Sequence, residues 1–510
     1  MADEHSQMLT ARRGGPARAW RMLLLAAACQ AQSADQPQWG ERFSRNMVSS
    51  ETNLPDAFDL STGRNVLWTA DLGTETHATP VVAGGRVYIG TNNGRPRDPR
   101  QVGDRGVLMA FDEKTGRFLW QLAVPKITTS VYWDWTGSGI CSPATVEGDR
   151  VYTVSSRGEV MCLDPKGLAD GNEGPFRDEG RHSVPAGQPA LEPGPADADV
   201  LWLFDMIQAL GVRQHDAAHC SILLDGQFLY VNTSNGVDDT HRHIASPDAP
   251  CLIVLDKQTG RLVARDGERI GPNIFHCTWS SPALGVVNGR KRIFYCGPDG
   301  IVYGFEPVAA ATDEVQTLKK VWWFDIDPGA PKENVHRFTA NRAESPSTIH
   351  AMPVFAGGRL YVAGGGDIWW GKRQAWLFCL DPAGAGDVTA TAKRWSHPLT
   401  RHVMSTPAVW SGLAFVADCG RKIHCLDAAT GEACWTHDIQ GEMWSSTLVA
   451  DGKVYVGTRR GEFVVLAASR EKRVLSSCQL DGPVSATPAA ANGVLYVATQ
   501  KKLYALKQGR

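Results

Sequence analysis

The chain has 510 residues, a formal net charge of −2, 52 glycines and 17 tryptophans. This balance excludes the strongly basic surface that general nucleic-acid binding requires, so we expect no nucleic-acid partner. The sequence contains no run of about eighteen apolar residues, which excludes a transmembrane helix in the mature chain. The length exceeds that of one ordinary core, and the many glycines and tryptophans favour an all-β array of repeated units.

The first part of the chain has the composition of an export leader. Four arginines precede a short apolar run over 22–28, and small residues follow it. Ala31-Gln32-Ser33 offers a cleavage site, whereas Cys29 resembles a lipoprotein acylation site and would carry a lipid anchor; a misassigned start to a soluble protein is the remaining alternative. We therefore expect a signal peptide or disordered leader over 1–34, an N-terminal extension over 35–56, and an exported protein that is periplasmic, in the cell envelope or secreted.

From residue 57 onward, one pattern of strands and turns repeats. A strand that starts near Ser-Pro or Thr-Pro is followed by a Gly-Arg/Lys-X-Tyr strand, then by an apolar strand that ends in Asp, then by Thr-Gly and Trp. The clearest copy runs from Thr79 through Asp112 and Gly116 to Trp120. A four-stranded unit cannot bury both of its faces alone, so it has to stack on copies of itself. The period of roughly 40–50 residues predicts a β-propeller.

The repeat predicts eight four-stranded antiparallel blades over 57–510. The last unit supplies only three strands, and a Thr-Gly-X-X-X-X-Trp segment at 62–68 has no strands before it. We therefore expect an N-terminal strand ending at Trp68 to complete the eighth blade and remove an exposed sheet edge. An insertion over 165–199 separates the third and fourth strands of blade two. The first strands of the blades are expected near Thr79, Ser142, Ser221, Ser281, Met352, Thr406, Ser445 and Thr487.

The segment from Ala110 to Trp120 resembles the tryptophan-docking motif of quinoprotein-type propellers, and further copies occur at 425–435, 254–264 and 59–68. On this basis the chain is similar to the pyrroloquinoline quinone (PQQ)-like, quinoprotein alcohol dehydrogenase-like repeat family, which includes outer-membrane assembly lipoproteins. The resemblance implies the eight-bladed fold, but it leaves catalysis and non-catalytic binding both open. Within the motif, Asp and Thr-Gly make a tight turn, and the Trp packs between neighbouring blades.

The cysteines occur in settings typical of buried thiols. Cys162, Cys251, Cys379 and Cys425 lie in apolar strand patterns, where a thiol behaves as a small hydrophobic group. No Cys-X-X-Cys motif is present among the twelve cysteines. We therefore expect mostly free, buried thiols, while a disulfide is not derivable from spacing.

Antiparallel strand order places the long loops on one face. The loops between second and third strands, and the links between blades, lie together on the face where the first strands begin. Expanded segments there carry Trp133, Trp135, His215, His241, Trp369 and Trp370. A scaffold that gathers irregular, aromatic loops on one side usually binds there.

One position per blade sharpens this expectation. The residue three places before the Pro, or its equivalent, of each first strand should belong to a ring around one mouth of the channel. The ring consists of His77, Ile140, His219, Trp279, His350, Met404, Trp444 and Ser485. Its histidines, tryptophans and methionine could form a ligand-binding collar, but a plug of packed side chains is slightly favoured.

A quinoprotein dehydrogenase requires a stacked ortho-quinone, a Ca²⁺ ion held by oxygen ligands and a carboxylate base. Asp134, between Trp133 and Trp135, is the candidate base on the resemblance to those enzymes, although its blade position differs from theirs. The adjacent cysteine pair of many such enzymes and a haem-attachment motif are both absent. PQQ and Ca²⁺ are therefore retained as an alternative only.

Two groups of residues are candidates for metal binding. Asp170 and Asn172 lie in a segment that resembles part of a Ca²⁺ loop, but its twelfth position would be Arg181. His77, His219 and His350 could converge on Zn²⁺ or Cu²⁺. No local spacing supports that metal site, so hydrogen-bonded structural histidines are favoured.

These observations predict an exported, non-catalytic binding or assembly module. Its partner, which is a small molecule, a glycan or a protein, is expected on the face where the innermost strands begin. A PQQ-dependent alcohol or sugar dehydrogenase is the alternative.

Overall fold

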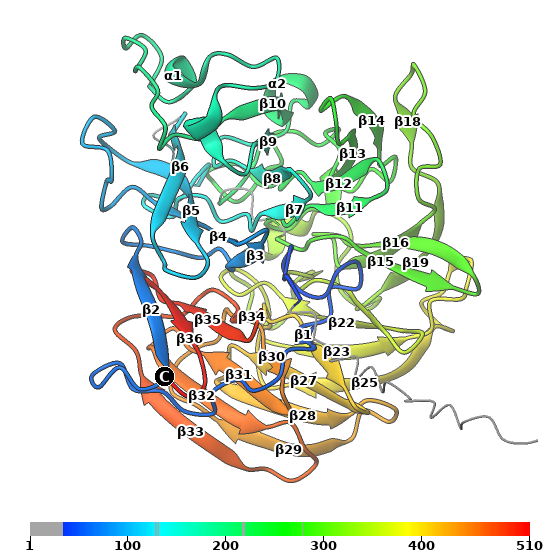
Figure 1. Ribbon diagram of the computed structural model, residues 1–510. Helices are drawn as coiled ribbons and strands as arrows, with labels where there is room; N and C mark the ends of the chain where they lie inside the picture. The colour runs from blue at the N-terminus through cyan, green and yellow to red at the C-terminus, as the bar shows by residue number, and fades with distance from the viewer. Residues whose placement is uncertain (1–33, 128–129, 131, 217–219, 278) are drawn as a thin grey trace, which may run out of the picture. The chain divides into compact units, whose positions relative to one another are not determined.

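The repeats fold as eight sheets, each with its first strand nearest a central channel and its last strand at the rim (Figure 1). This computed structural model describes residues 34–127, 130, 132–216, 220–277 and 279–510. The expected all-β, eight-bladed propeller is confirmed. The four main strands of each blade pair antiparallel, as they do in blade one, whereas a short added strand in blades three, four and seven pairs in parallel with its neighbour.

The first four blades follow one another along the chain. Blade one consists of β3 (Val81–Ala83), β4 (Arg86–Asn92), β5 (Arg105–Asp112) and β6 (Phe118–Pro125). Blade two consists of β7 (Thr145–Glu147), β8 (Arg150–Val154), β9 (Glu159–Leu163) and β10 (Val200–Asp205). Blade three consists of β11 (Leu223–Asp225), β12 (Phe228–Asn232), β13 (Leu252–Asp256), β14 (Leu262–Arg265) and β18 (Gln316–Thr317). Blade four consists of β15 (Ala283–Val287), β16 (Arg290–Cys296), β17 (Ile301–Phe305), β19 (Lys320–Asp325) and β24 (Gly386–Asp387).

The other four blades complete the ring. Blade five consists of β20 (Ser347–Thr348), β21 (Val354–Ala356), β22 (Arg359–Gly366), β23 (Ala375–Leu380) and β25 (Lys393–Leu399). Blade six consists of β26 (Ala408–Trp410), β27 (Leu413–Asp418), β28 (Lys422–Asp427) and β29 (Ala433–Asp438). Blade seven consists of β30 (Leu448–Ala450), β31 (Lys453–Gly457), β32 (Glu462–Ala467), β33 (Val474–Gln479) and β1 (Val48–Ser49). Blade eight consists of β34 (Ala489–Ala491), β35 (Val494–Ala498), β36 (Lys502–Leu506) and β2 (Val66–Asp71).

The eighth blade closes the ring as the sequence predicted. Strand β2 comes from the N-terminal part of the chain and pairs antiparallel with β36, with Val66 opposite Leu506 and Asp71 opposite Lys502. The last blade thus has its full set of strands, and the sheet edge that the C-terminal unit alone would expose is covered.

Tryptophans of the repeat connect neighbouring blades. The indole Nε1 of Trp68, in blade eight, donates to the carbonyl of Glu113 in blade one at 2.8 Å. Gly116 lies against the same ring, and a Cβ there would come within 2.6 Å of the indole. Trp395 of blade five lies against Gly431 of blade six in the same way. Glycine therefore both supplies the positive φ of the turn and leaves room for the indole.

An N-terminal strap, residues 34–51, crosses the channel and contacts every blade at its first strand or just before it. Val48 and Ser49 of this segment pair in parallel with β30. Backbone amides of the first strands donate to it from Val82, Val146, Leu284, Phe355 and Val449, and Val409 donates to the Asn46 side chain. Arg45 of the strap donates to Ser221 in blade three, and the Ser49 hydroxyl donates to the Ala490 carbonyl in blade eight. Figure 1 shows the strap in dark blue near the centre of the ring.

Arg45 fixes the strap in the channel. Its side chain is fully buried, and the guanidinium donates to the carbonyls of Pro282, Trp39 and Ser221 and to the Ser221 hydroxyl at 2.8–3.0 Å. Burial lowers the pKa of Arg45 to about 10, so the group stays protonated at neutral pH. A buried charge with this many acceptors is held in one position.

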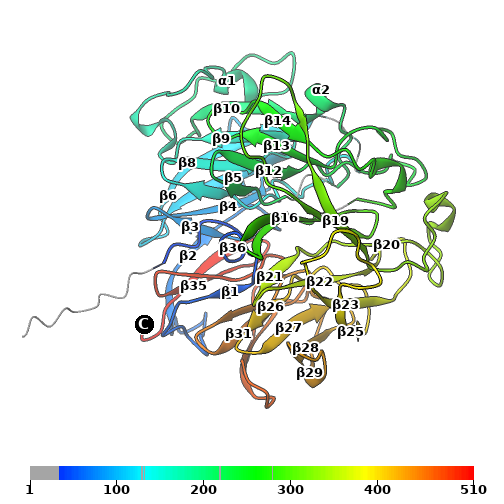
Figure 2. The same ribbon diagram turned by 90° about the vertical axis from the view of Figure 1, so that its right-hand side faces the viewer.

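Short helices lie outside the blades. The segment between β9 and β10 contains η1 (Gly167–Asp170) and α1 (Glu179–His182), and α1 lies at the outer edge of the ring in both views (Figures 1 and 2). His182 reaches Glu159 at 3.0 Å, so this segment covers the rim of blade two up to the level where β9 begins. The links between blades contain α2 (Met206–Leu210), η2 (Gly271–Asn273) and η3 (Val335–Phe338).

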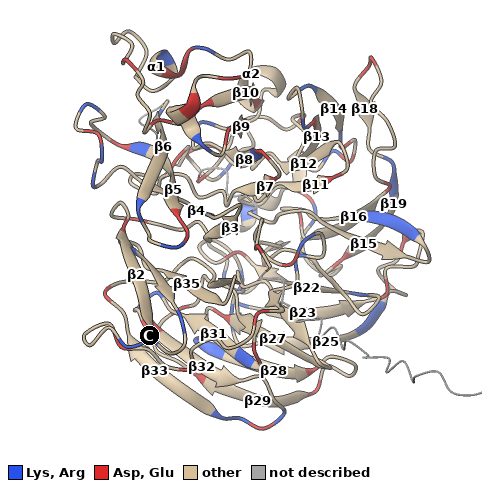
Figure 3. Ribbon diagram, viewed as in Figure 1, with Lys and Arg blue, Asp and Glu red and all other residues tan. Residues whose placement is uncertain are grey.

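Charge and cysteine placement agree with the composition. Basic and acidic residues are interspersed over the blades rather than gathered in one region (Figure 3). Eleven cysteines fall among the described residues; all of them are free and nine are buried.

No helix in the described part of the chain is long and apolar enough to cross a membrane. Residues 1–33 of the leader expected over 1–34, with Cys29, and the collar residue His219 lie outside the described residues.

Candidate functional site: an aromatic and imidazole cavity at the channel mouth

A cavity of about 470 Å³ occupies the channel on the face where the first strands begin. Links between blades and loops between second and third strands supply its walls, and Trp39 of the N-terminal strap lines it as well. The residues that line it include Trp39, Glu75, His77, Tyr132, Trp135, Asp216, His241, His276, Trp279, His350, Trp369, Trp370, Met404, Trp444, Arg459 and Ser485. The strap thus forms part of the cavity wall through Trp39.

The structure brings most of the predicted collar into this one cavity. The collar residues that line it are His77, Trp279, His350, Met404, Trp444 and Ser485. Ile140 is fully buried and packs within the core between blades one and two. These side chains border open space rather than filling the channel mouth completely.

Rings of the collar contact one another around the cavity. Trp279 lies beside His350 with 5.0 Å between ring centroids, and Trp369 meets Trp279 edge-on at 5.1 Å. His77 stacks on Trp444 with 6.1 Å between the ring centroids. The guanidinium of Arg459 lies 4.2 Å from the centroid of the same Trp444 ring. Such edge and face contacts hold the aromatic walls in defined orientations.

Several buried polar atoms of these walls have no partner in the protein. Trp39 Nε1, Trp444 Nε1, His276 Nε2 and His350 Nδ1 make no hydrogen bond with any residue that the structure describes. A buried polar group without a partner costs about 1–3 kcal/mol. Four such atoms belong to residues that line one cavity, so unpartnered polar groups lie close to whatever the cavity holds.

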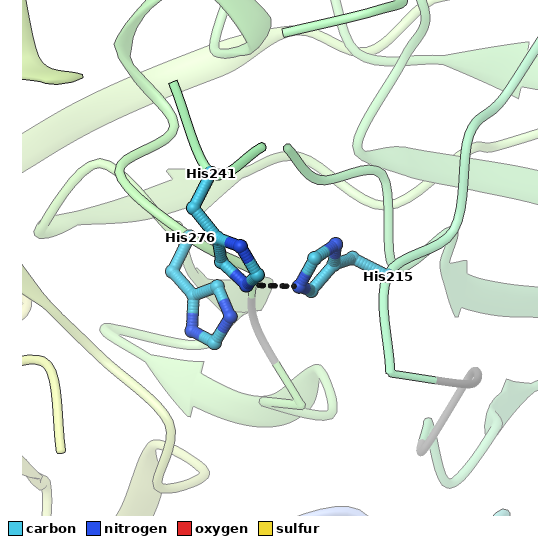
Figure 4. A group of neighbouring side chains, drawn as sticks. All are labelled: His215, His241 and His276. Atoms are coloured by element: carbon cyan, nitrogen blue, oxygen red, sulfur yellow. Dashed lines mark hydrogen bonds between the residues drawn. The ribbon is translucent and has the colours of Figure 1, made fainter. Parts of the chain in front are cut away.

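Three histidines form a cluster at the edge of the cavity (Figure 4). His215 lies in the link before blade three, His241 in the expanded loop of blade three, and His276 in the link before blade four. Their ring centroids are 4.8–5.3 Å apart, and the Nε2 atoms of His215 and His241 are 3.2 Å apart. Burial and the neighbouring His276 lower the pKa of His215 well below its usual value and that of His241 to about 4.

Asp367 connects this cluster to the collar. Its Oδ1 accepts from the backbone amides of Trp369 and Trp370 at 2.9 and 2.8 Å. Its Oδ2 lies 3.0 Å from His276 Nδ1 and 3.2 Å from His350 Nε2. Burial alone would raise the pKa of Asp367, but the two imidazoles hold it well below its usual range. The carboxylate therefore orients two rings and the loop that carries two tryptophans.

Asp216 provides a second carboxylate at the same edge. Its oxygens lie 3.7 Å from His276 Nε2 and 3.8 Å from His215 Nε2. Burial raises the pKa of Asp216 to about 6. Asp216 also has a φ of 56°, in the left-handed region that aspartate adopts more readily than most residues.

Opposite charges meet on the other side of the cavity. Glu75 lies 2.8 Å from His77, and this hydrogen bond lowers the pKa of the Glu75 carboxyl. Arg459 donates to the Ser485 hydroxyl at 2.6 Å. The formally charged groups that line the cavity are thus Glu75, Asp216 and Arg459, with Asp367 directly behind the wall.

The structure separates the predicted aromatic residues of the loops. Trp135, Trp369 and Trp370 line the cavity, whereas Trp133 does not and is instead covered by the Arg213 guanidinium at 4.9 Å. Asp134, the candidate base, is also not among the lining residues. Its Oδ1 pairs with Lys126 at 2.6 Å, and burial raises its pKa to about 7. The position of Asp134 gives it no access to a ligand in the cavity.

The candidate Ca²⁺ residues are engaged with other side chains. Asp170 pairs with Lys166 at 2.7 Å, and Asn172 donates to Glu179 at 2.9 Å. Both residues lie in the segment over the rim of blade two. Among the described residues, the two groups with metal-ligand geometry lie elsewhere, at His215, His241 and His276 and at Asp216, His276 and Cys277.

Sequence reasoning did not single out Glu75, Tyr132, Asp216, His276 or Arg459 as part of the site. His215 and His241 were placed on the correct face, but nothing in the sequence joined them to His276 because the three lie 26 and 35 positions apart on separate segments. The one sequence feature that pointed to this cluster was the strand order, which places the loops and links that carry the three histidines on the same face. A search of that face for all titratable residues would have found the cluster.

A family model described as "Outer membrane protein assembly factor BamB" matches residues 17–170 and 379–508. Among curated proteins, a quinohemoprotein alcohol dehydrogenase from Comamonas testosteroni is 30% identical over 116 residues, which make up 20% of this chain and 16% of that protein. The matched region therefore spans less than a fifth of this relative's length.

Among solved structures, BamB from Moraxella catarrhalis superposes with a TM-score of 0.56 at 12% identity, covering 87% of this chain and 99% of that one. The quinohemoprotein alcohol dehydrogenase from Comamonas testosteroni gives a TM-score of 0.47 at 13% identity, covering 93% of this chain and 81% of that one. At 12% identity, the likeness to BamB bears on the fold alone.

Proposed function

Because the chain belongs to the PQQ-like propeller family whose model is described as outer membrane protein assembly factor BamB, we propose that it is an exported, non-catalytic binding module. Its mouth cavity holds a small, neutral molecule that bears hydroxyl groups, such as a short glycan fragment. The observation that carries this proposal is the set of three buried polar atoms, on Trp39, Trp444 and His350, that have no partner among the described residues.

The size and walls of the cavity support a small ligand. A volume of about 470 Å³ falls within the range of roughly 300–1,000 Å³ that is usual for small-molecule sites. Six tryptophans line the cavity and offer broad apolar surfaces for stacking. Indole N–H and imidazole nitrogen atoms between these surfaces would donate to or accept from hydroxyl groups.

The charges of the cavity argue against PQQ. This cofactor carries three carboxylates, yet Arg459 is the one described Lys or Arg that lines the cavity, and Glu75 and Asp216 line it too. A trianion placed there would face two carboxylates with Asp367 behind them, at a substantial electrostatic cost. Ca²⁺ requires oxygen ligands, but the ligand-like clusters of the described residues are dominated by imidazole and thiol. The residues present therefore do not fit PQQ with Ca²⁺.

A protein partner on the same face is the second candidate. Val102, Ile127 and Trp135 are 45–69% exposed, and all three lie in the expanded loop of blade one or in the link that follows it. Of the three, Trp135 lines the cavity, and exposed apolar side chains are a feature of interaction surfaces. This candidate would be favoured if V102D and I127D changed the association of the protein while leaving small-ligand binding intact.

The experiment compares neutral and anionic ligands. A panel of neutral mono- and oligosaccharides and PQQ with Ca²⁺ are each titrated into the protein by calorimetry, and dye reduction is assayed with alcohols and sugars. We expect one neutral sugar to bind at one site per chain, to bind at least about tenfold more weakly to W444A, and to bind W410A normally. Trp410 is the control because it is 37% exposed and does not line the cavity.

Two results would contradict the proposal. Tight PQQ binding with substrate-dependent dye reduction would favour the dehydrogenase. A neutral panel that neither binds nor raises the unfolding temperature would exclude a small hydroxyl-bearing ligand.

A further inference from the structure

The histidine cluster at the edge of the cavity has the donor set of a metal site. His215, His241 and His276 come from three separate segments, yet their ligand nitrogens lie within 4.8 Å of one another. Three imidazoles around a tetrahedral Zn²⁺ ion stand about 3.3 Å apart, as follows from a Zn–N distance of about 2.0–2.1 Å. Small rotations of the rings would bring the described nitrogens to that spacing.

The outer hydrogen bonds of two rings leave the correct nitrogens for a metal. His215 Nδ1 donates to the Val237 carbonyl at 2.9 Å, which leaves Nε2 with its lone pair. His276 Nδ1 lies 3.0 Å from Asp367 Oδ2, and its Nε2 is buried without a hydrogen-bond partner among the described residues. Metal-binding histidines usually hold their second nitrogen in this way, against a carbonyl or a carboxylate.

The charge around the cluster balances a divalent cation. Asp216 has one oxygen 3.7 Å from His276 Nε2 and another 3.8 Å from His215 Nε2. Asp367 is fully buried and contacts the far side of His276. Two carboxylates beside three imidazoles would neutralise a charge of +2, and a buried ion requires such compensation.

The aromatic shell around the cluster limits access to one side. Tyr132 stacks on His215 with 5.8 Å between ring centroids and meets His241 edge-on at 4.5 Å. Trp370 lies 4.6 Å from His241, and Trp369 lies 5.4 Å from His276. Because His241, His276 and Asp216 line the cavity while His215 lies behind them, an ion would enter from the cavity.

We propose that His215, His241 and His276 bind one divalent d-block cation of the Zn²⁺ or Cu²⁺ class, with Asp216 as the nearest carboxylate to complete the site. Imidazole nitrogen is the ligand type that these ions share, whereas Ca²⁺ and Mg²⁺ require oxygen. The site differs from the pair of positions expected for Ca²⁺ at Asp170 and Asn172 and from the collar histidines His77 and His350. It does not depend on the identity of the ligand in the cavity.

The first test measures metal binding by the full chain, produced without a polyhistidine tag and stripped with a chelator. Zn²⁺ is added, excess metal is removed by dialysis, and the protein-bound metal is quantified. We expect one Zn²⁺ per chain for the wild type, and an affinity lower by more than about 100-fold for H241Q and H276Q, because losing a direct ligand exceeds the effect of an outer-shell change. H243Q is the matched control, since His243 lies in the same loop as His241 and is exposed.

The second test needs no variant and therefore survives misfolding of H241Q or H276Q. Cu²⁺ bound to the wild type is examined by electron paramagnetic resonance, and the tryptophan fluorescence is followed in the same titration. We expect hyperfine coupling to imidazole nitrogens and quenching at one equivalent, because Trp369 and Trp370 lie beside the cluster. Unfolding of the metal-free variants is compared with that of the metal-free wild type.

The outcomes separate clearly. A wild type that retains no Zn²⁺, a Cu²⁺ spectrum without nitrogen coupling, or equal binding by the wild type and a folded H241Q would each overturn the metal site. A neutral sugar that binds the metal-free protein as well as the loaded one would leave both proposals standing independently. Loss of sugar binding alone would contradict the proposed function and leave the metal site intact.

Discussion

The N-terminal strap and the mouth of the channel lie along the same axis, but they treat buried polar groups in opposite ways. In the strap, backbone amides from five blades find carbonyl partners, and the Arg45 guanidinium makes four hydrogen bonds. At the mouth, atoms on Trp444, His276 and His350 are buried without partners among the described residues. The strap is therefore arranged for stability, whereas the mouth keeps polar groups available for a ligand.

The largest effect is expected at Arg45. The substitution R45A should lower the free energy of unfolding by about 3–5 kcal/mol, because it leaves buried carbonyls of two blades and of the strap without a donor. Chemical denaturation monitored by tryptophan fluorescence measures the loss. R42A is the matched control: Arg42 is half exposed and pairs with Glu147, so a change below about 1 kcal/mol is expected. Equal effects of the two substitutions would show that the strap does not hold the blades.

The second prediction concerns pH and distinguishes the mouth from the strap. His402 lies in the link that carries Met404. Its pKa is lowered to about 4, mainly by burial and to a smaller extent by the positive charge of Arg401. The unfolded chain therefore binds a proton at His402 between about pH 6.5 and 4 that the folded chain does not, so stability falls as pH falls through this window. H402Q should remove about 3 kcal/mol of the stability loss between pH 7 and 4.

The pH prediction is checked by denaturation between pH 4 and 7. The exposed His243 supplies the control, and H243Q should keep the wild-type slope. R45A should lower stability by a similar amount at each pH, because Arg45 stays protonated throughout this range. If the free energy of unfolding of H402Q fell with pH as steeply as that of the wild type, other titratable groups would have to cause the loss of stability in acid.

The smallest effect on stability is expected at Trp444. W444F removes the unpartnered indole N–H but keeps an aromatic face beside His77 and Arg459. The loss of ring area and the loss of an unsatisfied donor oppose each other, so the free energy of unfolding should change by less than about 1 kcal/mol. Affinity for the neutral ligand should fall about tenfold through the missing hydrogen bond. A large loss of stability with unchanged affinity would reverse the contrast between mouth and strap.

The repeated pattern made the propeller and its closure predictable. Asp112, Gly116 and Trp120 belong to a unit whose turn and indole packing are local consequences of residue type, and each copy repeats them. The expected pairing of the segment ending at Trp68 with the C-terminal unit followed from counting strands, and β2 and β36 pair accordingly. The gathering of long loops on one face followed from strand direction alone.

Other parts of the site could not be predicted, because no periodic signal marks them. Arg45 lies in an irregular segment, and its partners Ser221 and Pro282 are 176 and 237 positions away. The collar residues could be read at one fixed offset from each first strand, but Glu75, Asp216 and His276 occupy no equivalent positions in other blades. Irregular links obey no repeat, so only their folded paths decide which side chains meet.

The sequence by itself determined the number of blades, the manner of closure and the face that carries the long loops, because these depend on strand period, turn residues and direction. The tertiary structure decided that the strap crosses the channel, that a cavity remains above it, and that three histidines and two carboxylates meet at its edge. Those contacts join segments far apart in the chain, and their formation depends on how the ring of blades places each link in space.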